Sequence, residues 1–382
     1  MKVIESMSDI SLRSEILTGN MVLSSHLARE WDDLFERSVS APPYLCHTWT
    51  DTFIRNKQMR GVPQLILVWS GEKLVALLAL AVRVFFGIRI AEPIGTSEPT
   101  YLGLLIDPEH PEAVNSIAEI IINQKPIDLL YNTNLSSEDG PTNELFKELA
   151  KKGFLCLCTY RTICHYIKLG ISYDEYIKQT KTAKRRKKLQ YEERKLFSSS
   201  DANVQYYEGK EVTSDVLKRL TEIQQSSRMK NRGAAVLGQS FYQELFLDMA
   251  KCGLCNVWLM TINGEDAAFV LDLEAHGELH YYRTAFKLKF DPSLSIGKIL
   301  TMRVIRNACD NGVLYFDFGH SDAEYKRFWG TDSKYVSRIA AGQGFMGRAG
   351  VICLWFAWWL AKHEWLRKQY RRVKKNLFAV QD

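Results

Sequence analysis

Two side chains that could move a proton lie three residues apart, at the end of an apolar stretch. Asp317 follows Val313-Leu314-Tyr315-Phe316, and His320 comes after Phe318-Gly319. Burial at the end of such a strand is expected to raise the pKa of a carboxyl group, which would suit Asp317 as a base near neutral pH. The alternative is that Asp317 caps the turn or pairs with Lys326. His320 carries the side chain that titrates closest to neutrality, although a histidine in such a turn can equally be a plain loop residue.

A turn earlier in the same segment could hold an anion. A strand is predicted from Glu278 onward, and the next helix opens with Ser295, Ile296, Gly297 and Lys298. The first N–H groups of a helix have no acceptor within it, and glycine lets a phosphate approach the backbone closely. An apolar pattern then runs to Ala308 and ends at Asn311-Gly312, a helix-stop signal. One glycine lacks the spacing of a P-loop or a Rossmann turn, so a turn or capping glycine is the plain alternative.

The order of these elements resembles the second half of the CelD/BcsL-like acyltransferases, a branch of the GNAT superfamily related to the FemAB and FemX aminoacyltransferases. Members carry a small-residue-Pro-Gly turn, a helix ending near glycine, and a strand running into Asp-Phe and then Tyr-Lys-x-x-Trp. The matching residues here are Ser295-Ile296-Gly297, Gly312, Asp317-Phe318 and Tyr325-Lys326-Arg327-Phe328-Trp329. Ile296 stands where the family has proline. The resemblance extends more weakly over residues 25–340.

The resemblance implies an α/β fold of tandem GNAT-like domains, each a mixed twisted sheet flanked by helices. It also implies an N- or O-acyltransferase that binds acyl-CoA (acetyl-CoA or longer) and transfers the acyl group directly in a ternary complex. The acceptor would be an amino sugar or another cell-envelope or polysaccharide precursor. Tyr325 and Lys326 would protonate or orient the substrate, and Arg228 and Tyr282 would line the acceptor side. The chain has no G-x-S-x-G motif, which argues against a serine hydrolase.

A faint internal duplication supports a tandem plan. Residues 63–82 and 256–273 each read as a strand, a turn and a strand, with Gly71 and Gly264 in the turns. Helices are predicted before each hairpin, at 23–38 and 46–56 in the first half and at 212–230 and 239–251 in the second. Such a long period indicates two similar domains, which we place at residues 1–170 and 171–341, followed by a C-terminal helical segment at 342–382.

The two halves differ in charge at the helix that follows the hairpin. In the first half this helix, about residues 111–123, is preceded by Asp107 and Glu109 and contains no glycine. Two carboxylates beside a helix N-terminus would repel a pyrophosphate. We therefore expect the cofactor in the second half only.

Size, charge and cysteines set broad limits. The 382 residues allow two domains with separate cores, and the net charge is +6. Eight cysteines and no secretory signal indicate free thiols in the cytoplasm. The pairs Cys252/Cys255 and Cys156/Cys158 could bind zinc only if they met in space, so we expect structural cysteines and no metal.

A basic run, Lys184-Arg185-Arg186-Lys187-Lys188, lies in a helix predicted over residues 173–197. We interpret it as a cleft edge facing an anionic acceptor, with a solvated helix face as the alternative. Nucleic acid is otherwise not expected, because aromatic platforms and a recognisable binding module are missing. One exception stays open, because FemX-type relatives use aminoacyl-tRNA as the donor.

The C-terminal segment combines aromatic and basic residues. Residues 349–361 are uncharged and include Trp355, Trp358 and Trp359, and seven cations follow from Lys362 to Lys375. Thirteen residues are too few to span a bilayer as a helix, but the pattern suits the surface of an anionic membrane. The expectation is a cytoplasmic protein on the inner face of the membrane, with a core complete by about Ala341. Packing of this helix on the protein, or a non-catalytic membrane-associated effector, are the alternatives.

Overall fold

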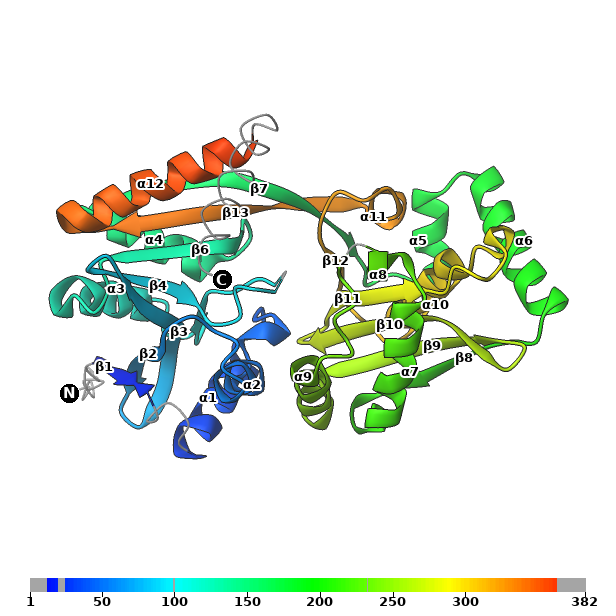
Figure 1. Ribbon diagram of the computed structural model, residues 1–382, viewed down its shortest axis with the longest axis horizontal. Helices are drawn as coiled ribbons and strands as arrows, with labels where there is room; N and C mark the ends of the chain where they lie inside the picture. Colours follow the sequence, from blue (N-terminus) through cyan, green and yellow to red (C-terminus); the bar gives the residue numbers. More distant parts are fainter. Residues whose placement is uncertain (1–11, 20–24, 99, 232, 363–382) are drawn as a thin grey trace, which may run out of the picture.

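The computed structural model describes residues 12–19, 25–98, 100–231 and 233–362, and its two lobes share one long sheet (Figure 1). The first lobe contains these elements: β1 (Leu12–Thr18), α1 (Ser25–Arg37), η2 (Pro43–Leu45), α2 (His47–Arg55), β2 (Val62–Ser70), β3 (Lys73–Phe85), β4 (Ile88–Pro93), β5 (Leu104–Ile106), α3 (Ala113–Gln124), β6 (Leu129–Ser136), α4 (Gly140–Lys151) and β7 (Leu155–Lys168).

The second lobe repeats the alternation of helices and strands. Its elements are α5 (Tyr173–Thr180), α6 (Ala183–Ser199), β8 (Ala202–Tyr207), η3 (Gly209–Glu211), α7 (Ser214–Gln225), α8 (Arg228–Asn231), α9 (Ser240–Lys251), β9 (Cys255–Ile262), β10 (Glu265–Ala275), β11 (Glu278–Phe286), η4 (Pro292–Leu294), α10 (Ile296–Asp310), β12 (Tyr315–His320) and α11 (Glu324–Trp329). The chain then returns to the first lobe through β13 (Asp332–Gly342) and α12 (Gly344–Lys362).

The predicted mixed α/β architecture with a helix-flanked sheet is confirmed. The strands run in the order β1-β2-β3-β4-β6-β13-β7-β12-β11-β10-β9-β8, with β5 beside β3. Both predicted hairpins, β2–β3 and β9–β10, are antiparallel pairs. The predicted helix over residues 173–197 is wrong in one respect, because it breaks at Lys181-Thr182. There Thr182 caps the second piece by accepting from the N–H of Arg185.

Two long strands join the lobes. β13 is hydrogen-bonded between β6 and β7, although it comes after the second-lobe elements in sequence, and β7 also pairs with β12. In Figure 1, β7 and β13 run side by side from one lobe to the other. The predicted division at 170/171 assigns the strand at 332–342 to the second domain, whereas this strand lies in the sheet of the first lobe. The division between two domains stays a prediction.

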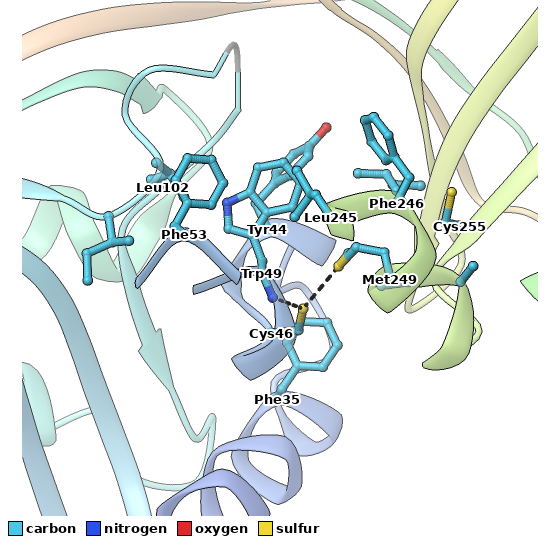
Figure 2. Close-up of a cluster of buried hydrophobic side chains, with 14 of the residues drawn as sticks. Phe35, Tyr44, Cys46, Trp49, Phe53, Leu102, Leu245, Phe246, Met249 and Cys255 are labelled. Atoms are coloured by element: carbon cyan, nitrogen blue, oxygen red, sulfur yellow. Dashed lines mark hydrogen bonds between the residues drawn. The ribbon is translucent and has the colours of Figure 1, made fainter. Parts of the chain in front are cut away.

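A shared core also ties the lobes together. Figure 2 shows Cys46, Trp49 and Phe53 of the first lobe against Phe246 and Met249 of α9. The Cys46 thiol lies 3.7 Å from the Met249 sulfur, and the Phe53 and Phe241 rings are 4.9 Å apart. Aromatic packing of this kind buries large apolar surfaces, so the two lobes are held at a fixed distance.

The helix α12 packs on the sheet, which corrects the expectation of a core complete by Ala341. Val351 is fully buried against Leu129 and Ala340, and Leu354 and Trp358 pack on the same cluster. The backbone of α12 at Gly347 lies close to the backbone of Asp128, because a Cβ at Gly347 would lie 2.2 Å from the carbonyl oxygen of Asp128. No helix in the described ranges has the length and hydropathy to cross a bilayer.

Candidate active site

The central feature of the second lobe is a short parallel ladder between β11 and β12. Three residue pairs face each other: Glu278 and Tyr315, Leu279 and Phe316, and His280 and Asp317. Beyond His280 and Asp317 the two strands no longer pair. β12 then pairs with β7 through an irregular register between Asp317 and His320. The strands β11 and β12 therefore part directly after the pair of His280 and Asp317.

Alternate residues of β11 point to opposite faces. The hydroxyl of Tyr281 lies 2.9 Å from that of Thr301 on α10, so this face belongs to the core under α10. His280 and Tyr282 point the other way, toward aromatic rings of the first lobe, with Tyr44 at 5.2 Å and 5.8 Å. The end of the ladder therefore stands between α10 and the first lobe.

The predicted anion turn opens α10 as expected. Ser295 occupies the N-cap position in the left-handed region (φ 51°) and makes no side-chain capping bond. Gly297 is helical, and a Cβ there would lie 3.1 Å from the ring of Phe286, so the glycine is explained by close packing. Ile296 is buried in the core. The helix start therefore presents backbone N–H groups without a side-chain cap.

Lys298 is already paired with a carboxylate. Its Nζ lies 2.9 Å from Oε2 of Glu192 on α6, and Lys195 of the same helix donates to the hydroxyl of Ser293. The basic run at 184–188 occupies the first turns of α6, with four of its five side chains exposed. The α6 side chains that contact α10 and η4 lie farther along the helix, at Glu192, Glu193 and Lys195. The place of the cations at the edge of an acceptor cleft stays a prediction.

Asp317 is an ionised, fully partnered carboxylate. Tyr101 donates its hydroxyl to both carboxylate oxygens at 3.0 and 2.9 Å, Lys334 lies 2.8 Å from Oδ2, and the N–H of Gly319 caps Oδ1. Burial is the largest single effect and opposes ionisation, but the charge of Lys334, a contribution from His280 and the hydrogen bonds from Lys334 and the N–H of Gly319 together outweigh it and lower the pKa of Asp317 to about 2. The prediction of a pKa raised by burial is therefore wrong, and the predicted pairing with Lys326 is replaced by Lys334.

His320 and Lys326 lie at the same strand end. Burial, followed by the charge of Arg161, lowers the pKa of His320 to about 3, and no hydrogen-bond partner for its ring nitrogens lies in the described ranges. The imidazole is neutral at pH 7 and a weak base. Lys326 donates to the carbonyl oxygens of Gly319 and His320, and burial lowers its pKa to about 8. Lys326 thus braces the turn after β12.

The remaining predicted residues lie on different sides of the ladder. Tyr325 stands on the α10 side, with its ring 6.3 Å from that of Phe318, and desolvation raises the pKa of its hydroxyl. Tyr282 faces the first lobe and donates to Glu98 at 2.6 Å. Arg228 is exposed at the start of α8, near the loop that leads to α10, because Ser226 accepts from the N–H of Leu288.

Four functional candidates escaped the sequence analysis: Tyr101, Lys334, His280 and Glu98. Glu98 is buried and accepts from Tyr242 and Tyr282, and it pairs with Arg283, so it anchors a first-lobe loop on the second lobe. Tyr101, His280 and Lys334 line a cavity of about 160 Å³ on the first-lobe side of the ladder. Of these residues, His280 gave a usable signal, a histidine between Leu279 and Tyr281 in a predicted strand.

No group of histidine, cysteine or acidic side chains in the described part of the chain is arranged to hold a metal ion. Cys252 is exposed near Thr48, whereas Cys255 is buried, and Cys156 and Cys158 lie on β7.

Comparisons with known proteins give a family match for one domain and a likeness of fold for most of the chain. Residues 183–327, from the start of α6 into α11, match the family model of the acetyltransferase (GNAT) domain. No curated protein matches the chain. Among solved structures, the chain is similar to FemX, with 12% identity over 82% of this chain and 95% of that chain and a TM-score of 0.62.

A second similar structure is the C-terminal domain (DUF2156) of a protein assigned as a lysylphosphatidylglycerol synthetase from Agrobacterium fabrum. It shows 12% identity over 85% of this chain and 94% of that domain, with a TM-score of 0.54. At these identities the likeness concerns the fold. The chain has a GNAT-superfamily fold related to that of FemX, and its second lobe contains a GNAT-type transferase domain.

Proposed function

We propose that the chain transfers an acyl group from acyl-CoA to an amine or hydroxyl of an amino sugar or another cell-envelope or polysaccharide precursor. The observation that carries this proposal is the interrupted β11–β12 ladder. An uncapped helix start lies on one face of it and a polar cavity on the other. Two reactants held on opposite faces would meet where the strands part, which is the geometry that direct transfer requires.

The residues at the start of α10 fit a phosphorylated donor. The N–H groups of Ile296, Gly297 and Lys298 lie at a helix N-terminus without a side-chain cap, and Lys298 adds a cation beside them. A side chain at Gly297 would press on the ring of Phe286, because its Cβ would lie 3.1 Å from that ring. Acyl-CoA would supply an activated thioester carbonyl. On this side of the ladder Tyr325, protonated at neutral pH, can donate a proton to a leaving group.

Asp317 serves in this proposal as a positioning residue. It holds Tyr101, Lys334 and the turn at Gly319 together where the ladder ends. Its low pKa makes it a poor proton acceptor near pH 7. Lys326 and His320 shape the same turn, and the neutral imidazole of His320 can donate or accept one hydrogen bond.

Calorimetry with a panel of acyl-CoAs tests the donor. The wild-type chain should bind one of them, and Gly297→Val should weaken that binding at least tenfold, or about 1.4 kcal/mol. A matched control is Gly238→Val, before α9, where a Cβ would lie 3.2 Å from the methyl carbon of Thr221 and φ is not positive. Equal losses in both variants, or no acyl-CoA binding in the wild type, would remove the cofactor assignment and favour a non-catalytic effector.

One observation favours a second donor, an aminoacyl-tRNA. The exposed cations of residues 184–188 lie in the first turns of α6, and the later turns of this helix contact η4 and α10, so a donor larger than CoA that extends along α6 could contact them. Replacing Lys184, Lys187 and Lys188 with glutamine should abolish retention of aminoacyl-tRNA in a gel-shift assay if that donor is used. Unchanged acyl-CoA binding in this variant, with no tRNA retention by the wild type, would leave acyl-CoA as the donor.

We further propose that α12 brings the protein to the inner face of an anionic membrane. One side of α12 is apolar and exposed, with Phe345, Ile352, Trp355, Phe356 and Trp359 between 40% and 86% exposed. Trp358, which was expected at the membrane, instead packs toward the sheet. Six further cations in residues 363–382 lie outside the described residues: Arg367, Lys368, Arg371, Arg372, Lys374 and Lys375.

A further inference from the structure

The cavity on the first-lobe side of the ladder is lined by residues of both lobes. The first lobe supplies the loop Ser38–Pro42 and the turn from Ser136 to Pro141, and the second supplies Glu278 and His280 of β11. Lys334 of β13 completes the lining. Its volume of about 160 Å³ is close to that of a protein cavity of roughly 150 Å³ that holds one benzene ring. One six-membered ring fits.

The lining of this cavity carries more negative than positive charge. Glu138, Asp139 and Glu278 contribute carboxyl groups, whereas the only lysine among the lining residues is Lys334. The charge of Lys334 is already matched by Asp317 at 2.8 Å, and Glu138 lies farther away at 3.8 Å. Burial raises the pKa of Asp139 to about 6, and its carboxylate caps α4 through the N–H of Thr142. Glu278 and Glu138 therefore leave the cavity negative at neutral pH.

His280 is an independent sign that a ligand belongs in the cavity. It is 2% exposed, and within the described part of the chain neither ring nitrogen has a hydrogen-bond partner. Its nearest acid is Glu278, with Oε2 3.6 Å from Nε2, and the rings of Tyr44 and Tyr101 flank it. A buried imidazole without partners costs free energy that a bound hydrogen-bonding ligand would recover.

His280 also occupies the position from which an acceptor could reach the donor. It is the last β11 residue of the ladder, opposite Asp317, and it lines the cavity. The next residue, Tyr281, points to α10. A ligand group beside His280 is therefore adjacent to the point where β11 and β12 part.

We propose that this cavity binds the acceptor as a ring-sized polar molecule bearing a primary amine in its ammonium form. This inference rests on the proposed acyl transfer and names its substrate class. Glu278 balances the ammonium charge, and a ring nitrogen of His280 takes one proton from it. The free amine forms the C–N bond to the acyl carbon, the C–S bond breaks, and the sulfur leaves as a thiol with the proton of Tyr325, which the second amine proton then replaces. His280 then releases its proton to water.

Calorimetry with three probes tests the binding step without any donor. Glucosamine should bind, while glucose, which lacks the amine, and N-acetylglucosamine, which lacks the charge, should bind at least tenfold more weakly. Glu278→Gln should weaken glucosamine binding about tenfold. Glu119→Gln, on the exposed face of α3, is the matched control and should change nothing. Equal binding of glucosamine and glucose, or unchanged affinity in Glu278→Gln, would overturn the proposal.

The transfer step has a separate readout. With glucosamine and acetyl-CoA, His280→Gln should lower kcat about 10²-fold while KM for glucosamine stays within a few-fold, because glutamine keeps a hydrogen bond but takes up no proton. Thermal unfolding shows whether His280→Gln is folded. If that variant is unfolded, Glu278→Gln still tests the cavity, because Glu278 lies at a partly exposed site. If glucosamine binds selectively but no acyl-CoA in the panel yields product, the proposed function fails and the amine site stands. If product forms and both variants match the wild type, the proposed acyl transfer stands and the proposed amine site fails.

Discussion

Asp317 shows how partners decide what a buried acid can do. Desolvation alone would keep this carboxyl group protonated, yet Lys334 and the hydroxyl of Tyr101 stabilise its ionised form. The partners come from three places: the first-lobe loop, β13 and β12 itself. The ionised carboxylate of Asp317 therefore links the two lobes, and we expect its substitution to destabilise the fold more than it affects proton transfer.

We predict that Lys334→Met lowers the free energy of unfolding by about 3–5 kcal/mol, because it leaves the buried Asp317 carboxylate without its charge partner. Urea denaturation followed by fluorescence measures the change. Lys147→Met, on an exposed face of α4, is the control and should stay within about 0.5 kcal/mol of the wild type. A loss below about 1 kcal/mol for Lys334→Met would mean that the ion pair does not hold the junction.

The pH dependence of stability follows from the same pair. The folded chain holds Asp317 ionised down to a pKa of about 2, whereas the unfolded chain protonates it near the ordinary value of 3.8. Its contribution is therefore complete above about pH 4 and is lost as the pH falls toward 2. Unfolding measured between pH 5 and 2 should show a steeper loss for the wild type than for Asp317→Asn. Parallel curves would contradict the low pKa.

The sequence indicated which residues gather at this site better than it indicated their charge states. Asp317 and His320 were found because they interrupt an apolar strand. Tyr101 was missed, since it lies 216 residues from Asp317 and meets it only through the fold. The prediction that the pKa of Asp317 is raised was wrong for the same reason, because its partners lie far away in the sequence. A pattern along one strand contains no information on a lysine that a different strand brings to 2.8 Å.

At the scale of single elements, α10 and its turn were predictable from local pattern and from glycine and capping signals. The break between α5 and α6 was not, because the basic run continues a helical pattern across Lys181-Thr182. The break matters for function, since it turns α6 so that Glu192 and Glu193 reach α10. Glu193 binds Arg303 and Arg306 farther along that helix, whereas Glu192 reaches its first turn.

We predict that the Glu192–Lys298 pair sets the affinity for an anionic donor at α10. Lys298→Met should weaken acyl-CoA binding about tenfold, and Glu192→Gln should strengthen it several-fold, because the lysine charge is then free for a phosphate. Titration calorimetry at two salt concentrations measures both. Glu193→Gln removes a similar α6–α10 bridge away from the helix start and serves as the control. If Glu192→Gln and Glu193→Gln behave alike, Lys298 does not contact the donor.

At the scale of the whole molecule, one sheet joins the elements proposed to hold the two substrates. Because β13 pairs within the first-lobe sheet, Lys334 lies beside Asp317. The same pairing lets α12, which follows β13, pack on that sheet. Neither consequence is visible in the sequence, because an internal duplication suggests two closed domains. The faces of α12 are also decided by this docking: Val351, Leu354 and Trp358 turn inward, and an apolar surface is left outside.

The membrane proposal is best tested on that outward surface, because deletion of the helix would uncover the sheet beneath it. Phe356 and Trp359 stack with ring centroids 5.8 Å apart and are 51% and 41% exposed. The double variant Phe356→Ser/Trp359→Ser should therefore keep the fold.

Liposome sedimentation measures the membrane binding. The wild type should be retained on anionic vesicles and much less on neutral ones, because each cation near an anionic surface contributes roughly 1 kcal/mol. High salt should release it, because salt screens these charges. The double variant should lose most of this retention. Tyr191→Ser, at an aromatic residue on α6 that is 61% exposed, should not lose it. Equal retention on neutral and anionic vesicles, or an unaffected double variant, would show that α12 is a structural helix only.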